Sequence, residues 1–364
     1  MSSISDHDEV VAAVLAFIAQ DGCDDAQFDA LALRLFAYQY ASDEPYRRFC
    51  QRRGATPRTV KHWPGIPPVP IDAFKELSLR SRPPQAGERV FMTSGTTRSD
   101  IKGRHFHPTL AVYDSSMTRN FARRFMQGSA RIEMAILFPD EQLMPNSSLA
   151  HYLALAASEF GTADSRYYVG PQGLDSAGLC EALARAQRNA TPFALLGASF
   201  SFVHLLDALR EQGRSFRLPA GSRVLDTGGY KGQSRELPLD AFYAQLSQAL
   251  GVDRSRCINM YGMTELSTQF YDAGNAQVPS VKSGPHWIRS RIVDPLSGRD
   301  VPAGERGILA HCDLANFNSV TTILTEDVGL AADGGFLLLG RAEGAQAKGC
   351  SLAVEEFIKA AAAA

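Results

Sequence analysis

Two short stretches, Thr93-Ser94-Gly95-Thr96-Thr97 and Tyr261-Gly262-Met263-Thr264-Glu265, decide the fold. Each follows a short apolar run, residues 90–92 and residues 257–260. A strand that ends in glycine and hydroxyl residues lets backbone N–H groups and hydroxyls surround a phosphate. A strand that ends in an aromatic ring, a hydroxyl and a carboxylate offers a stacking face, a phosphate donor and a magnesium ligand. We therefore expect the two stretches to form two halves of one ATP site.

The rest of the chain alternates between short apolar runs and helical patterns, which predicts an α/β body with layered helices and largely parallel strands. After residue 284 the pattern becomes strands joined by Gly, Pro and Asp turns, typical of a smaller β-rich subdomain. The expected strands are 89–92, 132–138, 166–169, 193–196, 223–226, 257–260, 287–293, 306–312, 319–324 and 335–340, and the expected helices are 109–127, 148–159, 176–189, 200–212 and 237–250.

This pattern predicts three parts. An α/β body with a helical N-terminal region, which would hold the expected ATP site, covers residues 1–284, the β-rich subdomain covers 285–340, and a short C-terminal segment, which carries Cys350, covers 341–364.

The bulk composition excludes several function classes. The chain has 364 residues, 45% of them hydrophobic, and a net charge of −2, so no overall field attracts nucleic acid or an anionic membrane. The start lacks the basic character of a secretory signal, and its apolar stretch is too short to span a bilayer. Six dispersed cysteines without a CxxC pair predict free thiols in a reducing cytoplasm. The histidine spacing gives no support for a zinc site.

Each motif also has an ordinary structural interpretation. A Ser/Gly/Thr stretch after a strand is often only a turn, and the Walker pattern GxxxxGK[ST] is absent. The tyrosine and glutamate of the second stretch are compatible with a buried ring and a helix start. Gly228-Gly229 follows a predicted strand as a simple glycine turn would, and Asp327 and Arg341 are compatible with an exposed turn and a surface cation. The order of all the motifs along the chain favours the nucleotide-site interpretation.

That order resembles the adenylate-forming superfamily, which includes acyl-CoA synthetases and phenylacetate-CoA ligases. Further stretches are similar to the LuxE-type acyl-protein synthetases over roughly residues 28–357. Those stretches are Pro45-Tyr46-Arg47-Arg48-Phe49, Phe74-Lys75, Arg104-His105, Leu196-Gly197-Ala198-Ser199-Phe200, Gly340-Arg341 and Lys348-Gly349-Cys350-Ser351-Leu352. The aspartate that usually follows the Gly-Arg pair in the superfamily is Glu343 here.

The resemblance implies a role for each motif residue. Tyr261 is expected to stack on adenine, and Glu265 to bind Mg²⁺. Phosphate binding is expected from Ser94, Gly95, Thr96, Thr97 and Thr264. Asp327 is expected to contact the ribose, and Arg341 the ribose or a phosphate. Gly228 and Gly229 are expected to line the adenine and acyl pocket, and Gly262, within the second stretch, is also expected to belong to the nucleotide site. Lys102, Arg104 and Lys231 are candidates for stabilising the leaving pyrophosphate, and residues 195–202 for lining the acyl pocket.

The C-terminus indicates the acyl acceptor. Superfamily ligases that load coenzyme A usually continue for about another hundred residues, whereas 14 residues follow Cys350 here. A thiolate is a natural nucleophile toward an acyl-adenylate. We expect Lys348 to favour the Cys350 thiolate and Gly349 to let the backbone bend inward. The alternative interpretation is that Cys350 is a small buried hydrophobe.

The sequence therefore predicts an ATP- and Mg²⁺-dependent acid–thiol ligase. It would convert a carboxylic acid, by family precedent a fatty acid, to an acyl-adenylate and then to a Cys350 thioester for delivery to an acyl reductase partner. One alternative is a phenylacetate-type ligase that loads coenzyme A or a carrier protein. The other is a non-catalytic subunit that binds nucleotide.

Overall fold

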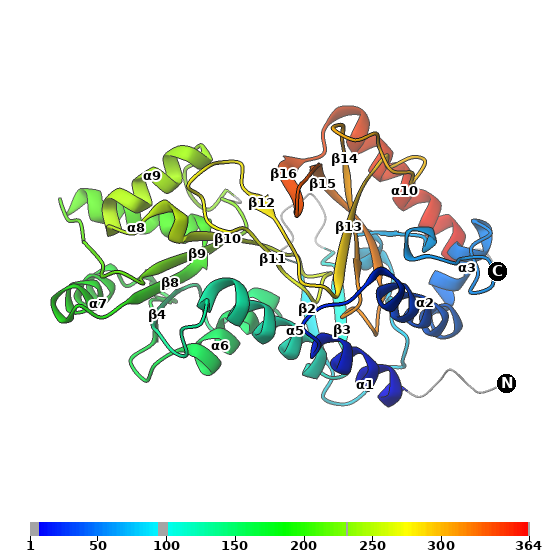
Figure 1. The fold of residues 1–364 in the computed structure, drawn as a ribbon, viewed down its shortest axis with the longest axis horizontal. Helices are drawn as coiled ribbons and strands as arrows, with labels where there is room; N and C mark the ends of the chain where they lie inside the picture. The colour runs from blue at the N-terminus through cyan, green and yellow to red at the C-terminus, as the bar shows by residue number, and fades with distance from the viewer. Residues whose placement is uncertain (1–6, 94–100, 231, 363–364) are drawn as a thin grey trace. The chain divides into compact units, whose positions relative to one another are not determined.

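The computed structural model describes residues 7–93, 101–230 and 232–362 (Figure 1). The chain divides into two compact units, which we treat separately. Unit 1 comprises Met1–Ser116, Met263–Thr268 and Ser283–Ala364, and unit 2 comprises Met117–Gly262 and Gln269–Lys282. This division differs from the expected boundary after residue 284. The N-terminal and C-terminal parts share unit 1 because strand β1 (Val69–Pro70) pairs with β15 (Thr322–Ala332).

Unit 2 is built on a six-stranded sheet in the order β11-β10-β9-β8-β4-β5. All neighbouring strands are parallel except β10 and β11, as the alternating pattern predicts. The strands are β4 (Glu133–Leu137), β5 (Arg166–Tyr167), β8 (Phe193–Ala198), β9 (Arg223–Thr227), β10 (Cys257–Tyr261) and β11 (Phe270–Tyr271). The helices of this unit are α6 (Ser148–Phe160), α7 (Ser176–Asn189), α8 (Ser199–Glu211) and α9 (Leu239–Leu250).

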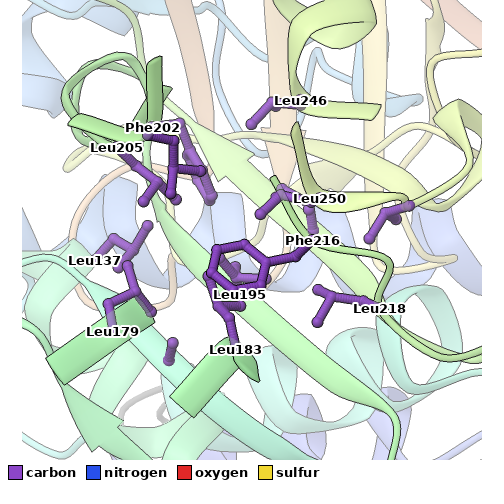
Figure 2. Close-up of a cluster of buried hydrophobic side chains, with 14 of the residues drawn as sticks. Leu137, Leu179, Leu183, Leu195, Phe202, Leu205, Phe216, Leu218, Leu246 and Leu250 are labelled. Carbon is purple, nitrogen blue, oxygen red and sulfur yellow. The ribbon is translucent and has the colours of Figure 1, made fainter. Parts of the chain in front are cut away.

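The core of unit 2 forms between this sheet and its helices. Leucine and phenylalanine side chains from β4, β8, α7, α8 and α9 meet there, as Figure 2 shows for Leu137, Leu179, Leu195, Phe202 and Leu246. The central strand β8 is buried at every position, which explains its continuous apolar run. Leu195 and Phe202 are fully buried in this core, whereas Phe200, in the same stretch, is half-buried.

Unit 1 contains an antiparallel sheet with β13 (Ile288–Val293), β14 (Arg306–Asp313), β15 and β16 (Gly335–Arg341) in that order. The N-terminal helices α1 (His7–Ile18), α2 (Asp25–Ser42) and α3 (Glu44–Arg52) and the short α4 (Ala73–Glu76) also belong to it. The C-terminal helix α10 (Gly344–Ala362) packs on α3, where the Phe357 ring lies 4.7 Å from the Phe49 ring. A bidentate ion pair between Arg53 and Glu356 adds to this contact.

The remaining elements are short or link larger ones. The hairpin of β2 (Arg89–Met92) and β3 (Arg104–His107) leads to α5 (Ala111–Phe121) and one π turn (Ala122–Met126). The others are β6 (Val169–Gly170), β7 (Gly173–Leu174), β12 (Val281–Lys282) and the 3₁₀ turns Trp63–Gly65 and Arg254–Arg256. None of the helices in the described part of the chain has the length and apolar character needed to cross a membrane.

Candidate functional site

The first motif follows strand β2 in the sequence, and only its first residue, Thr93, is described. Its residues Ser94, Gly95, Thr96 and Thr97 lie outside the described residues, as does Lys231. The stem that holds the loop is described. Thr93 N donates to Gly103 O at 3.0 Å, and Gly103 N donates to Thr93 Oγ1 at 2.9 Å. The hairpin therefore fixes both ends of the expected phosphate loop.

The Glu265 carboxylate lies against this stem. Its Oε1 is 3.4 Å from the point where a side chain at Gly103 would begin, so glycine at that position leaves room for the carboxylate. Glu265 is 6% exposed, and burial raises the pKa of its carboxyl to about 7. Among the described residues, this carboxylate forms no ion pair and no hydrogen bond with another side chain.

These features fit a Mg²⁺ ion that is held together with a nucleotide. An ionised carboxylate buried without a contacting cation is unfavourable, and a bound cation relieves that cost. Within the described part of the chain, no group of three or more His, Cys, Asp or Glu residues is placed to hold a metal on its own. Mg²⁺ commonly binds through one or two carboxylates plus substrate phosphates, which matches a single carboxylate beside the stem of the expected phosphate loop.

Asp327 and Arg341 come together across strands β15 and β16. They are cross-strand partners, and Arg341 Nη1 lies 3.2 Å from Asp327 Oδ1. Arg341 Nη2 also lies 2.6 Å from Glu326 Oε2. The expected strand ended at residue 324, before Asp327, which is wrong, because β15 continues to Ala332 and Asp327 lies within it. The pairing of β15 with β16 contains one bulge. Val328 pairs with Gly340 and Gly329 with Leu338, so Leu339 of β16 is the extra residue.

Sequence reasoning missed two further carboxylates beside this pair. Asp72, before α4, forms a 2.6 Å ion pair with Lys75, and its charge acts on the nearby carboxyl of Glu326. Burial and the charge of Asp72 raise the pKa of Glu326. Glu326 directly precedes Asp327, but nothing in the sequence around Asp72 points to this site, because the parallel pairing of β1 with β15 brings together segments about 250 residues apart in the sequence.

Unit 2 carries the other motif residues at the ends of its parallel strands. Tyr261 is the last residue of β10, and its ring packs against Phe270, with 5.8 Å between centroids. Gly228 follows β9 with φ of +72°, a conformation that favours glycine, and Gly229 is next. Ligands of open α/β sheets bind outside the carboxyl ends of the strands, where these residues lie.

A buried carboxylate holds these strand ends in place. Asp226 on β9 accepts hydrogen bonds from Ser199 Oγ and Tyr243 OH, both at 2.9 Å, and from Asn259 Nδ2 at 3.0 Å. Burial raises the pKa of this carboxyl to about 6, although all three hydrogen bonds oppose that shift. Asp226 thereby ties β9 to α8, α9 and β10 two residues before Gly228.

Cys350 lies in helix α10 in unit 1. The residue is 3% exposed and packs with Val293, Leu324 and Val328, while its Sγ lies 3.9 Å from Thr325 O. Burial, with a contribution from the Glu326 carboxylate, raises the pKa of the thiol to about 11.

The expected activation of Cys350 by its neighbours in the sequence is therefore wrong for this conformation. Lys348 is exposed and does not contribute to the pKa of the thiol. Gly349 does not bend the chain, because it lies within α10 and permits close packing against Pro295. All six cysteines are free, as expected, and Cys257 and Cys312 are core residues.

Comparison with known proteins identifies the family. The family model described as "Acyl-protein synthetase, LuxE" matches residues 1–359. The chain belongs to this family. It is 24% identical over 304 residues to a long-chain-fatty-acid–luciferin-component ligase of Vibrio harveyi, covering 82% of this chain and 77% of the relative. The protein of the same name from Aliivibrio fischeri is 23% identical over 312 residues, with 84% and 79% covered. The predicted family is confirmed, and with it the class of acid ligase.

Solved structures confirm the predicted fold. An open conformation of 2-hydroxyisobutyryl-CoA ligase, in complex with 2-HIB-AMP and CoA, matches with a TM-score of 0.63 and 15% identity. The match covers 87% of this chain and 74% of that structure. ATP-bound MatB from Rhodopseudomonas palustris matches with a TM-score of 0.51 and 16% identity, covering 69% and 47%. The chain thus has the fold of the adenylate-forming ligases.

Proposed function

We propose that this chain activates a carboxylic acid with MgATP and then acylates its own Cys350. In the first step a carboxylate oxygen of the acid attacks the α-phosphorus of ATP, and pyrophosphate leaves. In the second step the Cys350 sulfur attacks the acyl carbonyl, AMP leaves, and the thiol proton is released to solvent. The acid is already ionised at pH 7, so the first step requires no general base.

The observation that carries the proposal is the buried Glu265 carboxylate against the stem of the 93–103 loop, in a member of the LuxE family. We assign Mg²⁺ binding to Glu265, where the ion would neutralise charge on the phosphates. We assign adenine stacking to Tyr261, ribose contacts to Asp327, and ribose or phosphate contacts to Arg341. Phosphate contacts are assigned to Thr264 and residues 94–97, and the nucleotide-pocket backbone to Gly228, Gly229 and Gly262. Catalysis then rests on positioning and electrostatic stabilisation.

The substrate and partner assignments rest on the relatives. Both relatives are named as ligases of long-chain fatty acids and a luciferin component. We therefore propose a long-chain fatty acid as substrate and an acyl reductase as the protein that takes the acyl group from Cys350. In the described conformation the thiol is buried and protonated, so acyl transfer requires Cys350 to become exposed.

An exchange assay tests the first step separately from the second. Wild-type protein, ATP and Mg²⁺ are incubated with labelled pyrophosphate and a series of acids of increasing chain length. We expect acid-dependent exchange of label into ATP, which Glu265→Gln abolishes and Cys350→Ala retains. Absence of exchange with every acid would contradict the adenylation step and would favour a non-catalytic subunit. Formation of free acyl-CoA after addition of coenzyme A would instead favour the phenylacetate-type alternative.

A further inference from the structure

The segment Met263–Thr268, which carries Glu265, belongs to unit 1 although the strands on both sides of it belong to unit 2. It has no regular secondary structure, and residues 265–268 are buried. A buried turn leaves backbone polar groups without partners in a helix or sheet, and each unsatisfied group costs about 1–3 kcal/mol. Side chains of unit 1 form hydrogen bonds with these backbone groups, including those on both sides of the Glu265 Cα.

Asn316 contacts the backbone of Glu265 itself. Its Nδ2 donates to Glu265 O at 2.8 Å, and its Oδ1 accepts from Ser267 N at 2.9 Å. The residue is 1% exposed, so water does not compete for these bonds. One amide side chain therefore fixes the carbonyl of the metal-ligand residue and the N–H group two residues later.

Asp313, the last residue of β14, holds the other end of the segment. Its Oδ2 accepts from Ser267 N and Thr268 N, both at 2.9 Å, and its Oδ1 accepts from Thr268 Oγ1 at 2.7 Å and from Ala315 N at 3.0 Å. The carboxylate is fully buried, so these four donors replace its hydration.

His105 on β3 holds the residue before Glu265. Its Nδ1 lies 2.9 Å from Thr264 O, which only accepts, so we assign the proton to Nδ1. Its Nε2 then accepts from Ser319 Oγ at 3.1 Å. Burial lowers the pKa of this imidazole to about 4, which keeps the ring neutral and this hydrogen-bond direction fixed at neutral pH.

We propose that Asn316, Asp313 and His105 are positioning residues that fix the backbone around Glu265 and so hold its carboxylate in place for the nucleotide-bound metal. The inference rests on the proposed function, because it concerns the same metal site. Hydrogen bonds on the carbonyls of residues 264 and 265 and on the N–H groups of residues 267 and 268 restrain the backbone on both sides of the Glu265 Cα. Its side chain is then directed toward the hairpin stem at Thr93 and Gly103.

The chain offers a matched control for Asn316. Asn318 is also buried, at 3% exposure, and also donates from Nδ2 to a backbone carbonyl, Phe106 O, at 2.9 Å. That carbonyl lies on β3 and not in the Met263–Thr268 segment. Both substitutions remove a buried amide side chain, but only Asn316→Ala frees the Glu265 backbone. Asn316 also bonds through its Oδ1, whereas the Oδ1 of Asn318 has no partner among the described residues, so the thermal midpoint of each variant is recorded to compare their costs in stability.

The experiment measures Mn²⁺ binding to the protein–ATP complex by electron paramagnetic resonance, with the thermal midpoint recorded for each variant. We expect Asn316→Ala to weaken Mn²⁺ binding about tenfold, as changes behind a metal ligand commonly do. Asn318→Ala should leave binding within twofold of wild type. If Asn316→Ala does not fold, His105→Gln becomes the test variant and His105→Asn its control. Asn keeps an N–H donor near the position of the His105 Nδ1 atom, and Gln does not. His105→Gln should then weaken binding about tenfold, and His105→Asn should not.

The outcomes separate this inference from the proposed function. If wild type binds Mn²⁺–ATP and Glu265→Gln binds it more weakly, but the tested positioning variant binds like its control, the positioning role is contradicted. An equal loss of binding in a variant and its control also contradicts it. If wild type binds no Mn²⁺–ATP, or if Glu265→Gln binds like wild type, the proposed metal site itself is contradicted.

Discussion

Lowering the pH from 8 to 6 should weaken divalent-cation binding to the protein–ATP complex through the titration of Glu265. Burial raises the pKa of this carboxyl from the usual 4.5 to about 7. Because the cation binds the ionised form, a proton competes with it below this pKa. A solvent-exposed glutamate would show no such effect, because it stays ionised over this whole range.

The size of the effect follows from simple competition. With a pKa of about 7, the apparent dissociation constant of the metal is multiplied by about 1.1 at pH 8 and by about 11 at pH 6. The expected loss is therefore about tenfold, equivalent to about 1.4 kcal/mol. A terminal phosphate also titrates near pH 6, so part of the observed change belongs to ATP.

Comparison with Glu265→Gln isolates the protein's contribution. Mn²⁺ binding to each protein–ATP complex is measured across the pH range, and the ratio of the two dissociation constants is plotted. The ratio should change about tenfold between pH 8 and pH 6, because the amide does not titrate. A ratio that stays constant across this range would refute the assignment of the metal to a buried, titrating Glu265.

Two predictions concern stability. Lys282→Met should lower the free energy of unfolding by about 3–5 kcal/mol in urea titrations, because Asp272, 2.7 Å away and fully buried, loses its cation. The same change at the exposed Lys359 should cost less than about 1 kcal/mol, and equal effects would contradict the reasoning. Gly349→Ala should lower the thermal midpoint, because its Cβ would lie 2.8 Å from Pro295 Cγ, and overpacking costs about 1–3 kcal/mol. A higher midpoint would mean that helix propensity outweighs this contact.

The sequence predicted the repeating elements of unit 2 well. Helix α7 begins at Ser176 and ends at Asn189, as its pattern predicts, and Asp175 caps it through a hydrogen bond from Gly178 N. Strand β8 was recognisable because all of its residues are buried. Both signals are local, since a cap and a periodic apolar face depend on neighbouring residues.

The errors arose where tertiary contacts override local signals. Gly349 was expected to let the backbone bend inward at Cys350, but packing within unit 1 makes this segment helical, as α10, and buries the thiol. Asp327 follows polar residues typical of a turn, yet it pairs within the long strand β15. The hydrogen bonds of Asn316 and Asp313 to the Met263–Thr268 segment had no sequence signal, because they join residues 45 to 51 positions apart.

Acylation of Cys350 tests the central claim most directly. Wild type, Cys350→Ala and Cys312→Ala are incubated with ATP, Mg²⁺ and a radiolabelled long-chain fatty acid, and protein-bound label is measured before and after hydroxylamine. Cys312 is a matched control because its thiol is also free and buried. The account predicts hydroxylamine-labile label on wild type and Cys312→Ala and none on Cys350→Ala. Label on Cys350→Ala at the wild-type level would contradict it.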